Sequence, residues 1–316
     1  MAVHVRTFDN GGRRADFPDL LQQYGICADI LVCRRLLLFR KGFIKMKKKR
    51  LIIPGITAAA VFVFCGWQND MLTISRYFCS SAEIPKELDG FTIVQISDLH
   101  NKRFGKNQRR LLKKTAALEP DIIVITGDIV DSNHTNIDKA LEFAEGAADI
   151  APTYYVTGNH ERWLENCEFE ELLAGLRKSG VVILDNEWVD IEKDGGHFSL
   201  IGLDDLCLDG NTLKNMNLDD VEFNVLLAHE PQYIEEYSAA NVDLALTGHA
   251  HGGQFRLPFI GGIVAPDQGF FPEYIEGKHK SGGMEMIISR GLGNSIIPVR
   301  IFNFPEIVSV ELSCLK

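Results

Sequence analysis

From Phe91 onward the chain alternates between short apolar runs and amphipathic segments. The short runs are rich in β-branched and aromatic residues and predict strands at residues 91–97, 121–126, 153–157, 224–228 and 242–247. Segments with helical spacing separate them, at residues 106–118, 136–148, 167–179 and 232–240. Further strands are predicted at residues 181–184, 198–203, 285–289 and 307–312. This repetition indicates an α/β fold, with function at the carboxyl ends of the strands.

A second pattern precedes these strands. Met46 is followed by the basic run Lys47–Arg50 and then by 17 uncharged residues, Leu51–Trp67. A helix of that length spans about 26 Å, at the short end for a bilayer and long for a signal-peptide core. Residues 64–66 offer no small-residue cleavage site, which favours an uncleaved anchor over a signal peptide. A buried core helix is the third alternative.

An anchor of this kind predicts where the rest of the chain lies. Basic residues flanking a membrane span tend to stay in the cytoplasm, so everything after Trp67 is expected outside it, on a single-pass protein of the cell membrane. A cleaved segment would instead give a secreted or cell-wall protein. The predicted organisation is an N-terminal extension (1–45), a collar and anchor or signal segment (46–67), a linker (68–81) and a catalytic domain (82–316).

Residues 1–45 have no clear periodicity, and Met46 before a basic run is typical of a translation start. An over-long gene prediction would explain this extension. If it is translated, residues 34–50 carry nine basic residues and no acid, which suits anionic lipid.

Charge is distributed unevenly along the chain. Residues 1–81 carry 13 Lys and Arg against 5 acids (+8), so the net charge of −10 leaves −18 for residues 82–316. A strongly acidic domain is repelled by phosphate backbones, so no nucleic-acid partner is expected. The seven cysteines form no C-x-x-C pair, which argues against a zinc knot or a disulfide framework.

Polar residues of types that can bind metals follow five of the predicted strands. They are Asp98 and His100, Asp128, Asn159 with His160, His229, and the pair His249 and His251. In Asp98-x-His100 and His249-x-His251, residues two apart project to one side of an extended segment, so each pair can face one site. Carboxylates, an amide oxygen and imidazoles suit manganese, iron or zinc. A lone histidine after a strand is usually structural, but five such motifs in order predict a metal site.

The ordered set D-x-H, G-D-x-x-D, G-N-H-E, H and G-H-x-H resembles the calcineurin-like metallophosphoesterase superfamily, over residues 82–316. Its bacterial membrane or cell-wall branch is more similar still, through residues 97–100, 248–254, 289–293 and 298–306. Ala250 stands where that branch usually has threonine, between two expected ligands and without consequence for metal binding.

The resemblance implies a four-layer α/β/β/α sandwich and two divalent cations. One cation would take Asp98, His100, Asp128 and His251, and the other Asp128, Asn159, His229 and His249. Asp128 would bridge the pair. Two such cations lower the pKa of a bridging water and hold a phosphate for in-line displacement.

The resemblance also implies roles for residues beside the metals. His160 is not a ligand in the family pattern, which leaves it to contact the transferring phosphoryl group and protonate the leaving oxygen. Asp131 resembles the second acid of G-D-x-x-D, which orients this histidine; a turn residue is the alternative. Glu161 is expected to be structural. Arg290 and Arg300 are either bidentate phosphate ligands or members of structural ion pairs.

The predicted function is metal-dependent hydrolysis of a phosphodiester, pyrophosphate or phosphomonoester bond. The membrane segment favours a lipid or cell-envelope substrate over a soluble phosphomonoester. A non-catalytic, metal-binding interaction module is the alternative from another class, but such a relative is expected to have lost ligands or the histidine of G-N-H-E. All of them are present in this chain.

Overall fold

The computed structural model describes residues 7–8, 14–15 and 49–315, except 209, 217, 219–220, 258–260 and 295–298. Contacts divide the chain into residues 1–62 and residues 63–316. Within the first unit, β1 (Thr7–Phe8) pairs antiparallel with β2 (Arg14–Ala15). The rest of the predicted extension, and the basic run up to residue 48, lie outside the described residues.

Helix α3 (Lys49–Asp70) covers most of the predicted membrane segment. Across the residues that the structure describes, no helix combines the length and the apolar character needed to cross a membrane. The membrane segment therefore stays a prediction. The last turns of α3 belong to the second unit, where the Trp67 ring lies 5.2 Å from that of Phe304, centroid to centroid.

Two six-stranded sheets form the second unit. The first has the order β3-β18-β4-β5-β6-β7, with bounds β3 (Thr73–Ser81), β18 (Glu306–Cys314), β4 (Thr92–Ile96), β5 (Ile122–Thr126), β6 (Thr153–Val156) and β7 (Val182–Ile183). Strand β18 runs parallel to β3 and antiparallel to β4, and β4 to β7 are parallel to one another.

The second sheet has the order β16-β17-β11-β10-β9-β8. Its bounds are β16 (Gly277–Ser281), β17 (Met284–Ile288), β11 (Leu244–Thr247), β10 (Asn224–Leu227), β9 (Gly196–Gly202) and β8 (Glu187–Lys193). The four central strands are parallel, and β16 and β8 pair antiparallel at the two edges.

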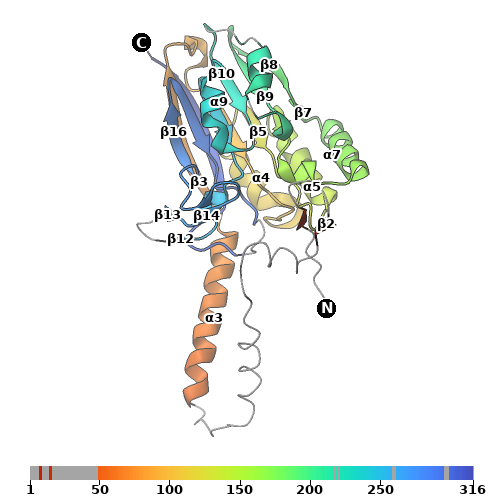
Figure 1. Cartoon of the computed structure of the whole chain (residues 1–316), viewed down its shortest axis with the longest axis vertical. Helices are drawn as coiled ribbons and strands as arrows, with labels where there is room; N and C mark the ends of the chain where they lie inside the picture. Colours follow the sequence, from red (N-terminus) through yellow and green to blue (C-terminus); the bar gives the residue numbers. More distant parts are fainter. Residues whose placement is uncertain are drawn as a thin grey trace. The chain divides into compact units, whose positions relative to one another are not determined.

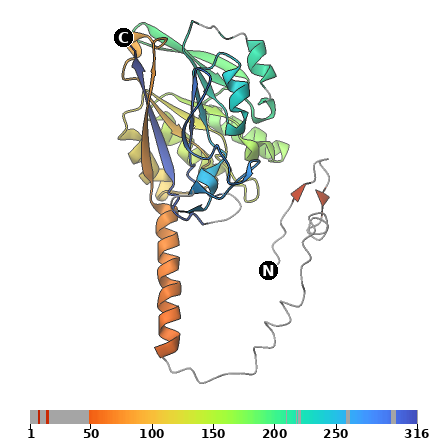
Figure 2. The same cartoon turned by 60° about the vertical axis from the view of Figure 1, so that its left-hand side comes forward.

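Alternation along the strands explains how the sheets and helices stack. In β5, Ile122 and Val124 belong to a core between the two sheets, whereas Ile123 and Ile125 pack under the helices of the other face. Those helices are α4 (Arg109–Ala116), α5 (Ile137–Ala148) and α7 (Asn166–Lys178). A third core lies between the second sheet and the helices α8 (Asn211–Met216) and α9 (Ile234–Ser238). The mixed α/β fold is thereby confirmed, with both sheets covered by helices (Figures 1 and 2).

Short elements complete the fold. The strands are β12 (Arg256–Leu257), β13 (Gly261–Gly262), β14 (Val264–Ala265) and β15 (Gly269–Phe270). The helical turns are α6 (Asn159–Arg162), η2 (Lys86–Leu88), η3 (Lys106–Gln108), η4 (Asp205–Cys207), η5 (Pro231–Tyr233) and η6 (His251–Gly253).

The structure differs from the expected boundary at residue 82. Residues 68–81 were expected to form a linker, but residues 73–81 form β3, which pairs with β18 along all nine residues. Because this partner strand lies more than 230 residues further along the chain, nothing local in the sequence marks the pairing.

The topology brings the end of α3 to one particular edge of the sheets. Strand β3 starts just after α3 ends, and β4 runs antiparallel to β18 while β18 runs parallel to β3. The carboxyl ends of β4, β5 and β6 therefore lie at the edge where β3 begins. This is also the edge at which the predicted metal ligands follow their strands.

Candidate metal centre

Asp128 lies at the centre of the predicted site. Its Oδ2 is 3.4 Å from His100 Nε2 and 3.3 Å from His229 Nε2, and its Oδ1 accepts a hydrogen bond from the His160 backbone N–H at 2.9 Å. Asp128 follows β5 in the first sheet and His229 follows β10 in the second, so the two sheets meet at this carboxylate.

Two groups of potential ligands share Asp128. In one group, atoms of Asp98, His100, Asp128 and His251 all lie within 4.8 Å of one another. In the other, the same holds for Asp128, His229 and His249. The Asn159 side-chain oxygen lies 3.0 Å from His229 Nε2 and 3.1 Å from His249 Nδ1, so it joins the second group. The seven residues thus fall into the two sets that the resemblance implied.

The local backbone at these positions is unusual. Left-handed φ angles occur at five of the seven residues: Asp98 (52°), His100 (45°), Asp128 (53°), His249 (63°) and His251 (47°). Non-glycine residues in this region are strained and cluster at functional sites. Gly158 gives the chain room here, because a Cβ on it would lie 2.4 Å from Asp128 Oδ1.

The donor atoms suit divalent cations. His100 Nε2 faces His251 Nε2 at 3.1 Å, and burial lowers the pKa of His100 to about 3 and that of His251 well below its usual value. Both rings are therefore neutral, the form in which an imidazole nitrogen can bind a metal ion. Burial also raises the pKa of Asp98, whose Oδ2 is buried without a hydrogen-bond partner among the described residues. A cation would offset that cost.

The pKa of the shared carboxylate, Asp128, shifts in the opposite direction from that of Asp98. Burial alone would raise the pKa of Asp128, but the neighbouring His229 and His160 hold it well below its usual range. Although burial disfavours a charged imidazole, Asp128 raises the pKa of His229 well above its usual value. Asp128 is thus ionised at neutral pH, the form that a ligand shared by two cations requires.

Glu161 holds two of the ligand-bearing loops together. It is fully buried, and its carboxylate accepts from the backbone N–H groups of Asp128 (2.8 Å), Gly158 (2.8 Å) and Val130 (3.2 Å). Burial and Asp128 raise the pKa of Glu161 to about 8, while these three hydrogen bonds favour the ionised form. This geometry agrees with the structural role expected for Glu161.

His160 lies beside the first group, with its ring 4.5 Å from that of His100. Its Nδ1 accepts from the Ser132 backbone N–H at 3.2 Å, so in the neutral ring the proton resides on Nε2. The Asp131 carboxylate, predicted to orient this ring, lies 3.7 Å from Nδ1, an ion-pair distance rather than a hydrogen bond. Ser132 occupies the nearer position.

Two contacts were not anticipated from the sequence. The Asp267 carboxylate, in the turn between β14 and β15, lies 3.0 Å from His249 Nε2, and this hydrogen bond lowers the pKa of Asp267. It leaves His249 Nδ1 facing Asn159. In the sequence, Asp267 lies in a glycine-rich segment without a motif, so no local signal marked it.

Arg300 is the second unanticipated contact. It is buried, donates to the carbonyl oxygens of Gly293 and Arg290, and brings Nη2 within 3.5 Å of His251 Nδ1. Arg290 instead pairs with Glu306 and Glu276. Both arginines are therefore engaged inside the protein, which favours the structural alternative over direct phosphate binding.

Comparison with known proteins agrees with this chemistry. The sequence profile of the calcineurin-like phosphoesterase family matches residues 91–253. The chain is 29% identical to the uncharacterised metallophosphoesterase YkuE of Bacillus subtilis, over 86% of this chain and 97% of YkuE. It is 30% identical to the metallophosphoesterase YkoQ of the same organism, over 68% of this chain and 81% of YkoQ. It is 29% identical to the phosphodiesterase YaeI of Escherichia coli, over 70% of this chain and 82% of YaeI.

A two-sheet α/β fold with a buried cluster of aspartates and histidines at its strand ends, together with the family match and the similarity to a phosphodiesterase, identifies a hydrolase of phosphoric esters with a candidate metal site. More particularly, the chain belongs to the calcineurin-like phosphoesterase family, and the three relatives named above are bacterial.

The geometry of Glu161 gives a prediction about stability. In Glu161→Gln an amide NH₂ must face backbone N–H donors, so at least one of the three hydrogen bonds is lost and a buried donor is left unpaired. We expect the free energy of unfolding of the metal-free protein to fall by about 2–4 kcal/mol, measured by denaturant titration. Glu170→Gln, at an exposed position of α7, serves as the matched control. Equal stability of the two variants would contradict the assignment.

Proposed function

We propose that the chain hydrolyses a phosphodiester bond in a lipid or cell-envelope molecule, with a water activated by two divalent cations. The observation that carries the proposal is the pair of ligand groups that share Asp128 at the buried edge where both sheets end. Manganese, iron or zinc would suit these ligands, because they comprise two carboxylates, one amide oxygen and four imidazoles without a thiolate.

When bound, the two cations would lower the pKa of a water between them and hold the phosphate for in-line attack. The protein's own residues then have separate tasks. Asp128 would serve as a ligand in both metal sites, Glu161 fixes the loops, and Asp267 keeps His249 turned toward Asn159. In the neutral ring His160 directs Nε2–H at a phosphoryl or leaving-group oxygen as a hydrogen-bond donor. Proton transfer starts from the protonated ring, whose Nδ1–H can donate to Ser132 Oγ at 3.2 Å and which returns to the neutral form when Nε2 gives up its proton. Asp131, at 3.7 Å, offers an opposite charge when the ring is protonated.

Two further points support the choice of substrate. The similarity to YaeI, a phosphodiesterase, favours a diester over a monoester. The metal ligands lie at the edge of the sheets where α3 ends and β3 begins, so a chain anchored through residues 46–67 would hold its site next to the membrane. A non-catalytic metal-binding module on the same scaffold is the second candidate; a metal-loaded protein that turns over no phosphoester would favour it.

The proposed location can be tested in cells. The basic run Lys47–Arg50 before the uncharged segment predicts that residues after Trp67 lie outside the cytoplasm. Alkaline phosphatase fused after Pro85 is therefore expected to be active, and a reporter that works only in the cytoplasm is expected to be silent at the same position. The opposite pattern would mean that the orientation is wrong.

The metal requirement is tested by removal and replacement. Chelation is expected to abolish turnover, and manganese, iron or zinc to restore it. Because Asp128 belongs to both ligand groups, Asp128→Asn should lower the metal occupancy of both sites. We expect kcat/KM to fall by more than about 10²-fold, since replacing a residue that only hydrogen-bonds to a metal ligand typically costs up to about that much. Asp138→Asn, at an exposed position of α5, is the control. Metal content by mass spectrometry accompanies each assay, and full turnover by a verified metal-free sample would refute the mechanism.

His160 can be separated from metal binding. We expect His160→Ala to keep both metals and to lose about 10²–10⁴-fold in kcat, the usual scale for general acid catalysis. The loss is expected to be larger for an alkyl ester than for a nitrophenyl ester, because an alkoxide needs protonation to depart.

The matched control is His134→Ala, since His134 is exposed and lies 3.7 Å from the same Asp131 carboxylate. A His160→Ala protein that has lost its metals, or that turns over both esters at the normal rate, would overturn the role of His160. Equal losses on the two esters would instead mean that Nε2 stabilises phosphoryl charge without transferring a proton.

A further inference from the structure

Exposed aromatic side chains gather at the edge of the sheets that carries the metal ligands. Phe270 and Phe271 are 78% and 69% exposed and lie in the aromatic loop, residues 264–271, which comprises β14 and β15. The same loop carries Asp267, whose carboxylate contacts His249. The exposed rings thus lie three and four residues from a group in direct contact with a candidate metal ligand.

The aromatic loop is connected to the end of α3. The Phe271 N–H donates to the Ile263 carbonyl, the Ile263 N–H donates to the Phe255 carbonyl, and Phe255 forms a β-bridge with Ile301. The next residue, Phe302, is half exposed, and its ring lies 5.8 Å from that of Phe64 in α3. Figures 1 and 2 show β12, β13 and β14 at the end of the sheets where β3 begins.

A positively charged segment flanks the same end of α3. The basic segment, residues 102–114, contains seven Lys and Arg and no acid, within a part of the chain that is otherwise strongly acidic. Arg110 forms an ion pair with Asp70, and the Lys102 ammonium donates to the Asn69 carbonyl, so this segment adjoins the last turn of α3.

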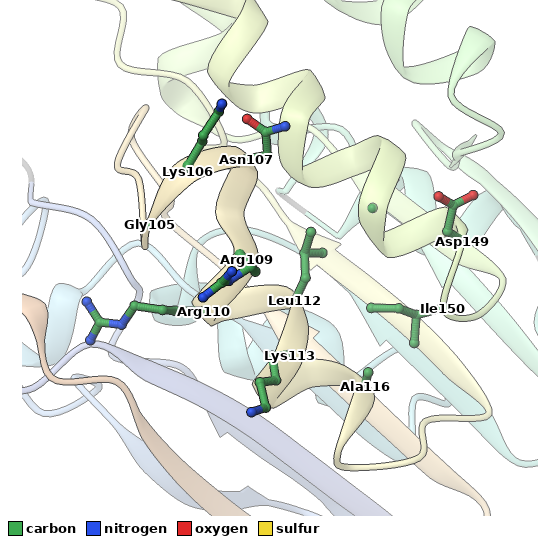
Figure 3. A pocket seen from close by; sticks show the side chains of 11 residues that line it. Gly105, Lys106, Asn107, Arg109, Arg110, Leu112, Lys113, Ala116, Asp149 and Ile150 are labelled. Atoms are coloured by element: carbon green, nitrogen blue, oxygen red, sulfur yellow. The ribbon is translucent and has the colours of Figure 1, made fainter.

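Several of these charges are directed at solvent. Lys106, Arg109, Arg110 and Lys113 line a surface pocket between α4 and α5, together with Leu112 and Ile150 (Figure 3). Asp149 also lines it. Lys106, Arg109 and Lys113 are exposed and have no carboxylate partner among the described residues. Arg109 and Arg110 stand in the first turn of α4, where the helix dipole disfavours positive charge, so folding stability does not explain them.

We propose that the aromatic loop and the basic segment form one docking surface, which rests on an anionic lipid bilayer. Aromatic rings suit the boundary between headgroups and acyl chains, and lysine and arginine suit anionic headgroups. Trp67, half exposed near the end of α3, adds a third exposed aromatic ring and contacts Phe304. Because the metal ligands lie at the same edge, this docking directs the site at phosphate groups of the bilayer. The inference rests on the proposed membrane location, but it does not require turnover.

The test uses the full-length chain in vesicles of phosphatidylcholine, with or without phosphatidylglycerol. A photoreactive benzoylphenylalanine replaces Phe270 or, as the matched control, Leu315. Leu315 is also exposed and apolar, but it follows the far end of β18, at the opposite edge of the sheets. Lipid adducts are expected at position 270 and only background at position 315.

A charge-reversed variant tests the basic segment. Lys106→Glu with Arg109→Glu should lower the adduct yield at position 270 in phosphatidylglycerol vesicles by about tenfold or more, and should leave it unchanged in neutral vesicles. Arg177→Glu with Lys178→Glu, two exposed positions at the end of α7, controls for net charge.

Equal lipid adducts at positions 270 and 315, or adducts at position 270 to a second copy of the chain instead of lipid, would overturn the docking surface. An equal effect of the two charge-reversed variants would exclude the basic segment from it. Cross-linking is measured without substrate, so a failure of phosphodiester hydrolysis with normal lipid adducts would count against the proposed function alone.

Discussion

The structure depends on one buried carboxylate. Each polar atom of Asp128 is committed: its N–H to Glu161, its carbonyl to the His100 N–H, Oδ1 to the His160 N–H, and Oδ2 to the space between His100 and His229. A buried charge so placed is tolerable only when it is surrounded by compensating charge. This is why ligands from both sheets converge on it, and why the two sheets end at one edge.

That convergence is costly for the backbone. Five of the seven candidate ligands have left-handed φ angles, each costing about 1–3 kcal/mol, although Asp, Asn and His tolerate this region better than most residues. The surroundings enforce these conformations. Glu161 holds the turns after β5 and β6 together, and the His249 N–H donates to Asp98 Oδ1 across the two sheets. The apolar core between the sheets keeps the strand ends from separating. The free energy of binding a cation would offset this backbone strain.

The sequence was informative where a signal is local. Five strands are short runs of β-branched and apolar residues, and their bounds were predicted to within about two residues: β4, β5, β6, β10 and β11. The candidate metal ligands directly after these strands were also recognisable in the sequence. It gave no signal for β3, whose partner β18 is distant along the chain. Strands β8 and β16 were also missed, because they are edge strands with partly exposed faces, although each forms a hairpin with the next strand. The contacts of Asp267, Ser132 and Arg300 depend on chain reversals that periodicity does not encode.

Only one residue, Arg300, separates the end of α3 from a candidate metal ligand. The Asn69 side chain accepts from the Arg300 N–H at 2.9 Å, and the guanidinium of Arg300 reaches to 3.5 Å from His251 Nδ1. Burial lowers the pKa of Arg300 to about 10, still far above neutrality, so a fixed positive charge stands behind the site. Its carbonyl partners in Gly293 and Arg290 allow little movement. The end of α3 and a candidate metal ligand thus contact the same residue, Arg300, through its backbone and its side chain respectively. The geometry of the site is therefore tied to the element that we propose as the anchor.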